Sequence, residues 1–267
     1  MLAGLVLRFL PVLSQARLLA ANISVGEHPQ AKWFGMTVDL DTIWATAVAG
    51  IVVMAIGLAL RARATSGVPG KLQLVWELGV EAVQRQVESS IGPRGARVVP
   101  LAVTLFVFIL VANWFEAFDL GSKYEFLPAP TGDINLPLAM SFFVIILVHM
   151  ASVRTRGLVG YVRHYVLQPF PWFLFPVNVF INVVEEVAKP ITLALRLFGN
   201  MLSGGLMLAL LAALVAWHIF GVPVGYGFVV VLNPVCKAID MGIGAIQAFI
   251  FALSAILYFD MAMREEH

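Results

Sequence analysis

The sequence predicts an all-α integral membrane protein with five membrane-crossing helices, one amphipathic surface helix, and a last pair of helices that are long and strongly tilted. Three observations lead to this prediction. The 267 residues are 60% hydrophobic and 12% charged, whereas soluble domains are about half apolar and a quarter charged. Apolar runs recur along the chain, and the last two are longer than one bilayer crossing requires. Polar residues within those two runs gather on one side of each helix.

The amino-terminal segment, residues 1–41, is expected to be extracytoplasmic. Arg8 and Pro11 interrupt its apolar run, no basic residue precedes that run, and no small-residue cleavage site is obvious. We interpret residues 1–20 as an ordinary amino-terminal segment, with a processed leader as the alternative. A single membrane domain then covers residues 42–262.

The first crossing helix is predicted at about residues 42–63. Residues 42–60 carry no charge, and a run of about 20 apolar residues at 1.5 Å per residue spans the hydrocarbon core. The run ends in Arg61 and Arg63.

Residues 71–91 predict a helix that lies on the membrane surface. Apolar side chains share one face, and charged or amide side chains share the other. The apolar face consists of Leu72, Val75, Trp76, Val80, Val83 and Val87.

Two further crossing helices are predicted at about residues 97–116 and 134–153. The loop between them is acidic, and arginines flank their opposite ends. A basic excess marks cytoplasmic ends, so the amino terminus and this loop are expected outside and the carboxy terminus in the cytoplasm. The arginines at the cytoplasmic ends are Arg61, Arg63, Arg94, Arg97, Arg154, Arg156 and Arg163.

The last two helices are predicted at about residues 176–217 and 226–262. A continuous helix of about 40 residues is roughly 60 Å long, twice the hydrocarbon thickness. Such helices must tilt steeply or break, and Pro190 and Pro234 are candidate kinks.

Polar residues of the first long helix gather around Arg196. At 100° per residue, all but Glu186 lie within about 40° of Arg196, so this face meets water, a partner or both. We call this set the Arg196 stripe: Asn178, Asn182, Glu185, Lys189, Thr192, Arg196, Asn200 and Ser203.

The last helix repeats the pattern at a spacing of seven residues, which drifts by only about 20° per step. Lys237 lies at the edge of this face. We call the set the Asp240 stripe, and two such stripes can face each other and line a hydrated path: Asn233, Asp240, Gln247, Ser254 and Tyr258.

Arg196 can act only as a fixed charge, because a guanidinium keeps its proton in proteins. Placing an isolated arginine at the bilayer centre costs from about 3 to over 10 kcal/mol of free energy. Attraction to a carboxylate about 4 Å away offsets roughly 4 kcal/mol of this cost at an effective dielectric constant of about 20. Glu185 and Glu186 lie about 15 Å away along the helix. Asp240 or a carboxylate from another subunit remains as the partner.

Other side chains predict no further chemistry. Seventeen basic residues nearly cancel sixteen acidic ones, so net charge indicates neither nucleic acid nor an acidic substrate. Cys236, the single cysteine, excludes a disulfide framework and a cysteine-based metal cluster. His149, His164 and His218 lack the spacing of a metal site. No GxxxxGK[ST] phosphate loop is present.

Two motifs carry a family resemblance. Arg-Leu-Phe-Gly-Asn occupies residues 196–200, and Gln-Ala-Phe-Ile-Phe occupies residues 247–251. With the order of hydrophobic segments over about residues 30–262, this combination is highly specific and resembles subunit a of the bacterial F-type ATP synthase. The resemblance implies a multi-pass protein of the bacterial plasma membrane, with no catalytic activity, cofactor or direct nucleotide binding of its own.

The resemblance also implies partners and roles. Arg196 is implied to face the carboxylate of each passing subunit of the c-ring and to prevent protons from passing straight between two half-channels. The peripheral-stalk subunit b and the lipid bilayer are further implied partners, and nucleic acid is not. The implied proton pathway comprises Asn200, Gln247, Asp240, Glu185, Glu186, Lys189 and Ser203.

The chain departs from the family pattern at two positions. Many relatives carry a glutamate nine residues after the arginine and a histidine seven residues before the glutamine, where this chain has Gly205 and Asp240. We therefore hypothesise that Asp240 is the outer proton relay.

Several alternatives stay open. The amides of Asn200 and Gln247 can simply join helix to helix, Lys189 can extend toward the cytoplasmic surface, and Glu185 and Glu186 can be solvated at a helix end. Sodium can replace protons. A secondary transporter would show related halves, and a proton-pumping subunit of a redox complex would spread its relays over several crossings; neither pattern is found in this sequence.

Overall fold

A computed structural model describes most of the chain outside its amino-terminal segment. The predictions for residues 1–20, for most of the acidic outer loop, for His218 and for the carboxy-terminal end lie outside the described residues. Those described are 30–33, 36–65, 67, 69–115, 128–167, 172–215 and 224–263.

The described residues are predominantly helical, as the sequence predicts. Three short 3-10 turns, Pro93–Arg97, Pro130–Gly132 and Trp172–Leu174, connect the helices. The helix boundaries lie close to the predicted ones except for α5, which is much longer: α2 Leu40–Arg63, α3 Lys71–Ile91, α4 Val99–Trp114, α5 Asn135–Leu167, α6 Phe175–Val215 and α7 Val224–Met263.

Among the described residues, four helices are long and apolar enough to cross a membrane, where the sequence predicted five crossings. Helix α6, one of the predicted crossings, is not among these four. The four segments are Leu40–Arg63, Gly95–Trp114, Asn135–Arg163 and Phe228–Met263.

A short β-hairpin precedes α2 and was not predicted. Strands β1 (Gln30–Trp33) and β2 (Met36–Asp39) pair antiparallel, with Gln30 opposite Asp39. Four-residue strands give too little alternation to be recognised from sequence. The hairpin leads directly into the first residue of α2.

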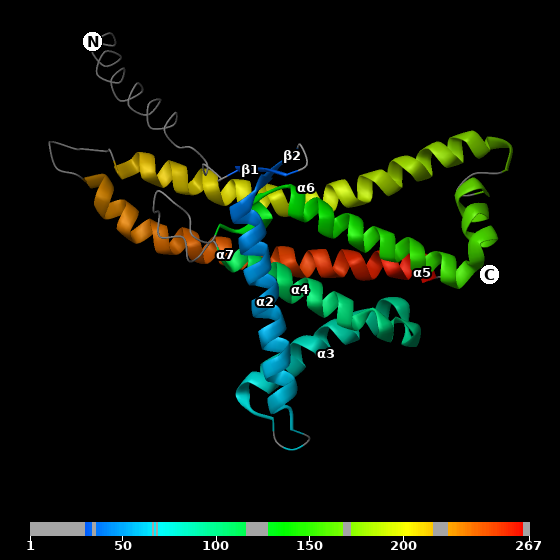
Figure 1. The fold of residues 1–267 in the computed structure, drawn as a ribbon, viewed down its shortest axis with the longest axis horizontal. Helices are drawn as coiled ribbons and strands as arrows, with labels where there is room; N and C mark the ends of the chain where they lie inside the picture. Colours follow the sequence, from blue (N-terminus) through cyan, green and yellow to red (C-terminus); the bar gives the residue numbers. More distant parts are fainter. Residues whose placement is uncertain are drawn as a thin grey trace, which may run out of the picture.

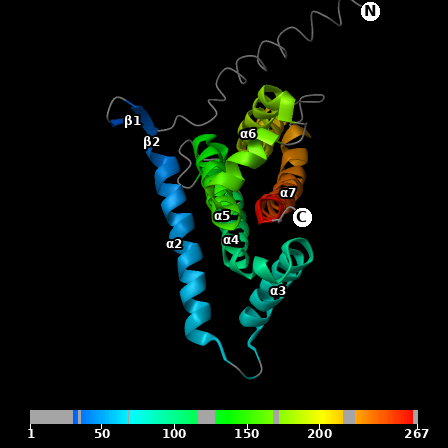
Figure 2. The ribbon, with the colours of Figure 1, turned by 90° about the vertical axis from the view of Figure 1, so that its right-hand side faces the viewer.

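The long helices lie along a common axis, and α2 lies across them. Helices α5, α6 and α7 run along the longest axis of the molecule (Figure 1), and the perpendicular view shows α2 standing beside α4 and α5 (Figure 2). Helices α6 and α7, of 41 and 40 residues, thus lie across the membrane-length helix α2 (Figure 1), and their tilt in a membrane stays a prediction. One buried cluster joins four helices, with members such as Ile109, Val144, Leu197 and Phe251.

Helix α3 packs its apolar face against α4 and α7. Val87 is fully buried there, with Trp76, Val80 and Val83 packed around it. Val75, assigned to this face from the sequence, is instead 71% exposed. The predicted face was therefore too wide by one position, since Val75 lies 100° from Trp76.

Helix α5 extends well beyond its predicted end at residue 153. Its backbone breaks at Gly157, with φ 72° and ψ 165°, and helical structure resumes to Leu167. Glycine adopts a positive φ without the steric clash that a Cβ atom causes. The chain turns sharply there (Figure 1).

The two candidate proline kinks do not break the long helices. Pro190 lies inside α6 and Pro234 inside α7, and both helices continue past them. Helix α6 shows only a shallow bend near its middle (Figure 1). Prolines are tolerated in membrane helices when small local adjustments satisfy the freed carbonyls.

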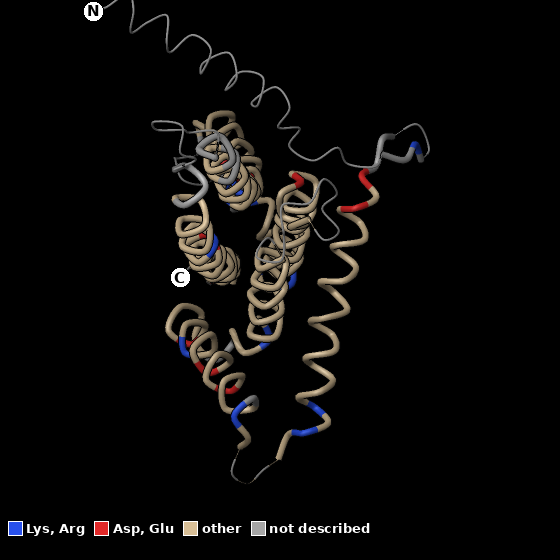
Figure 3. Tube along the Cα trace, turned by 90° about the vertical axis from the view of Figure 1, so that its left-hand side faces the viewer, with Lys and Arg blue, Asp and Glu red and all other residues tan. Residues whose placement is uncertain are grey.

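Charges are distributed unevenly along α2. Asp41 lies in its first turn, and Arg61 and Arg63 lie in its last turn. Figure 3 shows this separation along the standing helix, whereas the neighbouring α3 carries both basic and acidic residues. The charge pattern behind the predicted orientation is therefore retained in the fold.

Candidate functional site

The helical geometry of α6 turns Arg196 outward. Leu193 and Leu197, on either side of it in sequence, are 2% and 1% exposed and belong to the central cluster. Arg196 itself is exposed and makes no ion pair with any described residue. The alternative of an internal pair with Asp240 is therefore not found within the described part of the chain.

Gln247 of α7 reaches the same turn of α6. Its Nε2 atom donates to the backbone carbonyl oxygen of Arg196 at 3.4 Å, a distance typical of a weak hydrogen bond. The structure thus brings these two predicted residues together through the backbone, and it leaves the guanidinium unbound within the described chain.

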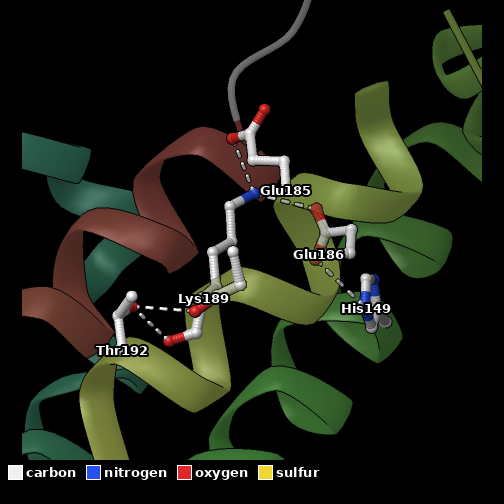
Figure 4. Close-up of polar contacts among 6 residues, drawn as sticks. His149, Glu185, Glu186, Lys189 and Thr192 are labelled. Carbon is white, nitrogen blue, oxygen red and sulfur yellow. Dashed lines mark hydrogen bonds and ion pairs between the residues drawn. The ribbon is translucent and has the colours of Figure 1, made fainter. Parts of the chain in front are cut away.

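Lys189 lies between two carboxylates of its own helix (Figure 4). Its Nζ atom is 2.8 Å from Oε1 of Glu186 and 3.1 Å from Oε1 of Glu185. The Lys189 side chain is 15% exposed, Glu186 21% and Glu185 51%. These charges are therefore compensated locally, and exposure to solvent increases toward Glu185.

His149 of α5 joins this cluster, which the sequence did not predict. Its Nε2 atom is 3.4 Å from Oε2 of Glu186, and its Nδ1 atom is 3.2 Å from the Tyr161 hydroxyl. His149 is isolated in sequence from all of these groups, so only helix packing reveals it. Glu186, the polar residue off the Arg196 stripe, is the one that faces α5.

A cavity of about 60 Å³ opens beside this cluster. Its volume accommodates a few water molecules, since one needs about 10–15 Å³ by this measure. Arg156 of α5 is held at its rim by a bond from Nη2 to the carbonyl oxygen of Met261, at 3.1 Å. The polar residues that line the cavity are His149, Ser152, Arg156, Glu186, Lys189 and Tyr258.

Helices α6 and α7 are antiparallel, and two contacts establish this. Gln247 meets Arg196, and the ring centroid of Tyr258 lies 5.8 Å from the Lys189 Nζ atom. Moving back along α6 therefore corresponds to moving forward along α7. Asp240, which precedes Gln247, consequently lies on the opposite side of Arg196 from the Lys189 cluster.

Asp240 lies next to a hydrogen-bonded junction between α4 and α7. Asn113 Nδ2 donates to the Gly244 carbonyl oxygen at 3.0 Å, and Trp114 Nε1 donates to that of Met241 at 3.2 Å. The Thr131 hydroxyl donates to Asn113 Oδ1 at 2.7 Å. Asp240 is half-buried and makes no ion pair with a described residue.

Gly244 permits this junction, because a Cβ atom there would lie 3.0 Å from the Asn113 Cβ atom. Sequence reasoning missed Asn113 and Thr131, although an amide near the end of an apolar helix is a recognisable signal.

The Arg196 stripe does not face a single environment, although the angular positions of its residues around the helix predict one. Asn178 is fully buried and donates to the Val166 carbonyl oxygen at 3.1 Å. Asn200 is half-buried, and Ser203 is exposed. The neighbours of α6 change along its length, so one end of this face packs against α5, whereas Ser203 at the other end is exposed.

Together these features define a class of protein: a helical membrane protein with one long polar-striped helix that carries a compensated charge cluster and an uncompensated arginine. The sequence matches the family described as ATP synthase A chain over residues 42–260. The chain belongs to this family.

Curated relatives agree over most of the chain. It is 48% identical to ATP synthase subunit a of Acidothermus cellulolyticus over 250 residues, covering 93% of this chain and 86% of the relative. It is 46% identical to ATP synthase subunit a of Mycobacterium bovis over 260 residues, covering 94% and 98%. The corresponding protein of Mycobacterium marinum is 45% identical over 257 residues, covering 93% and 97%.

Proposed function

We propose that this chain is the proton-channel stator subunit in the membrane sector of an F-type ATP synthase. It forms two offset half-channels and, through Arg196, couples proton translocation to rotation of the c-ring. It performs no ATP chemistry itself and requires no cofactor. The family membership and the names of its relatives, ATP synthase subunit a, support this function.

The exposed, unpaired state of Arg196 carries the proposal. A cation that deep in an apolar helix needs a carboxylate to offset several kcal/mol of desolvation. The described part of the chain supplies none, so the carboxylate comes from a partner. An added Cβ atom at Gly199, which lies about 60° from Arg196 around the helix, would meet no described atom within 4 Å, so the surface beside Arg196 is open to a close-packed helix.

The placement of acidic groups on opposite sides of Arg196 supports two half-channels. Asp240 lies about 10 Å before Gln247 along α7, and Lys189 lies about 10 Å before Arg196 along α6. Because the helices are antiparallel, these groups diverge from the arginine in opposite directions. Asp240 serves as the outer relay, Asn200, Gln247 and Ser203 line the pathway near the arginine, and the Lys189 cluster lies at the cytoplasmic outlet.

Orientation and partners complete the proposal. The chain resides in the bacterial plasma membrane with its amino terminus outside, as the basic ends of the crossing helices favour. The c-ring binds the open face around Arg196, and the peripheral-stalk subunit b holds the chain against rotation. The membrane potential supplies about 2.3 kcal/mol per proton per 100 mV. This is too little for one proton to drive the synthesis of one ATP, so the rotor sums the contributions of several protons.

The test is Arg196→Ala in the complete synthase, reconstituted in vesicles. We expect ATP-driven proton pumping to be lost while the complex still assembles with its c-ring, because the missing charge has no structural partner in the chain. Leu195→Ala, at a neighbouring position that is 48% exposed, is the matched control and should retain pumping. Undiminished pumping by Arg196→Ala would contradict the proposal.

A further inference from the structure

Five side chains form a continuous line of polar contacts around Lys189 of α6. Successive separations are 3.2 Å from Tyr161 to His149, 3.4 Å from His149 to Glu186, 2.8 Å from Glu186 to Lys189 and 3.1 Å from Lys189 to Glu185. Figure 4 shows the four of these residues that it labels, from His149 on α5 to Glu185 on α6. We call this set the His149 line.

The backbone of α5 is shaped to complete this line. Tyr161 follows His149 by twelve residues, which a straight helix would separate by about 18 Å. The break at Gly157 folds the end of α5 back so that the tyrosine hydroxyl reaches the imidazole. Asn178 secures this end through its bond to the Val166 carbonyl oxygen.

The imidazole differs chemically from its neighbours in the line. Lys189 is held between two carboxylates, and an ammonium has only donors, so it cannot accept a proton. An imidazole can bind a proton at one nitrogen and release one from the other. His149 therefore can exchange protons with Glu186.

Water has access to the same ring. His149 and Glu186 both line the cavity of about 60 Å³, and their side chains are 30% and 21% exposed. The other titratable or charged groups of the cavity wall are Arg156 of α5, Lys189 of α6 and Tyr258 of α7. A proton can therefore reach the ring from the protonated carboxyl group of Glu186 and leave it to a water molecule in the cavity.

We propose that His149 is a proton relay of the cytoplasmic half-channel, held in place by Tyr161; this inference rests on the proposed function. A proton passes from Oε2 of a protonated Glu186 to Nε2 of the neutral imidazole, which leaves a carboxylate beside an imidazolium. The imidazolium then transfers one ring proton to a water molecule in the cavity, and the ring is neutral again. Glu186 is restored to accept the next proton.

The test measures proton flux through the membrane sector of the complete synthase in vesicles, after its soluble catalytic part is removed. We expect His149→Gln, which retains hydrogen bonding without a proton-exchanging ring, to lower the flux about tenfold, which is less than the roughly 10²–10⁴-fold typical of general acid–base catalysis because cavity water still conducts. Met150→Gln, at an exposed neighbouring position, is the control and should match the wild type. Tyr161→Phe should give a smaller loss, as a positioning residue.

Chemical rescue separates relay from structure. We expect added imidazole to restore flux to His149→Ala, which leaves space for the ring, and not to His149→Gln. Vesicles with the wild-type sector, given the same imidazole, correct for any direct action of imidazole on the gradient. Flux that is unchanged in His149→Gln, or that imidazole fails to restore in His149→Ala, would overturn the relay.

The two proposals fail in different ways. If Arg196→Ala pumps normally, the proposed function fails and the relay fails with it. If Arg196→Ala loses pumping while both His149 variants conduct normally, the relay alone is overturned. Equal recovery of the c-ring with every variant shows that the comparison concerns assembled complexes.

Discussion

Lys189 and Arg196 are cations on the same stripe of the same helix, about two turns apart, yet their surroundings are opposite. Lys189 is mostly buried and lies within 3.1 Å of two carboxylates from its own chain. Arg196 is exposed and makes no ion pair with any described residue. Among the described residues, one charge is compensated within the chain and the other is not.

This difference separates two uses of charge in an apolar helix. Removing a cation that is compensated within its chain leaves buried carboxylates unpaired and so destabilises the fold. A cation that is left uncompensated stabilises the fold of the isolated chain little, but it strongly favours any partner that brings a carboxylate. Variants at Lys189 should therefore affect stability, and variants at Arg196 should affect transport.

The largest effect among further variants is expected at Asp240. We expect Asp240→Asn to lower proton-driven ATP synthesis about a hundredfold, because an amide cannot carry the proton of the outer half-channel. The variant should leave assembly intact, since Asp240 makes no ion pair with a described residue. Synthesis rates in energised vesicles provide the measurement.

Asp240→Glu keeps the carboxyl group and is the matched control for this prediction. It should retain a large part of the activity. Wild-type rates from Asp240→Asn would show that the outer relay lies elsewhere.

The next effect concerns the compensated cation. We expect Lys189→Met to lower the free energy of unfolding by about 2 kcal/mol, because Glu186 loses its short charged partner; the Glu185 contact adds little because that carboxylate is half-exposed. Detergent unfolding of the purified subunit measures the difference. Lys189→Arg should lose less, and equal stability of Lys189→Met and wild type would remove the contrast between the two cations.

A smaller effect is expected from the backbone that brings Tyr161 to His149. Gly157→Ala should lower the free energy of unfolding by about 1 kcal/mol, because alanine is strained at φ 72° although its Cβ atom would meet nothing within 4 Å. Gly79→Ala, inside α3 and equally open, should instead raise stability by about 0.5 kcal/mol. The same unfolding assay distinguishes the two signs.

The smallest effect belongs to a third kind of charge, an exposed pair on α3. The Arg85 Nε atom lies 4.0 Å from Glu81 Oε1, with side chains 68% and 59% exposed. We expect Arg85→Ala to change stability by less than about 0.5 kcal/mol. A loss of stability as large as that of Lys189→Met would show that burial does not determine how much these charges contribute to the free energy of unfolding.

Much of the fold could be predicted from the sequence because hydrophobic runs and helical periodicity are local signals. The boundaries of α3 follow from the separation of apolar and polar residues onto two faces of the helix, and so does the burial of Val80, Val83 and Val87. The continuation of α5 past residue 153 could not be predicted, because Gly157 gives the same local signal whether a helix ends or bends there.

The candidate site was predictable only where its residues share one helix face. Helical periodicity places Lys189 and Arg196 on one stripe. It does not show that α5 lies beside Lys189 and leaves Arg196 exposed. His149 was set aside because a lone histidine has no pattern in sequence. Its contact with Glu186 depends on the packing of two helices, which spacing along the chain does not encode.

The most direct test of the account is a resolved structure of this chain in its assembled complex. The measured quantity is the distance from the Arg196 guanidinium to the nearest carboxylate. We expect a rotor carboxylate within about 4 Å, with Asp240 turned away from the arginine. A guanidinium paired with Asp240, and no rotor carboxylate near it, would contradict the central claim.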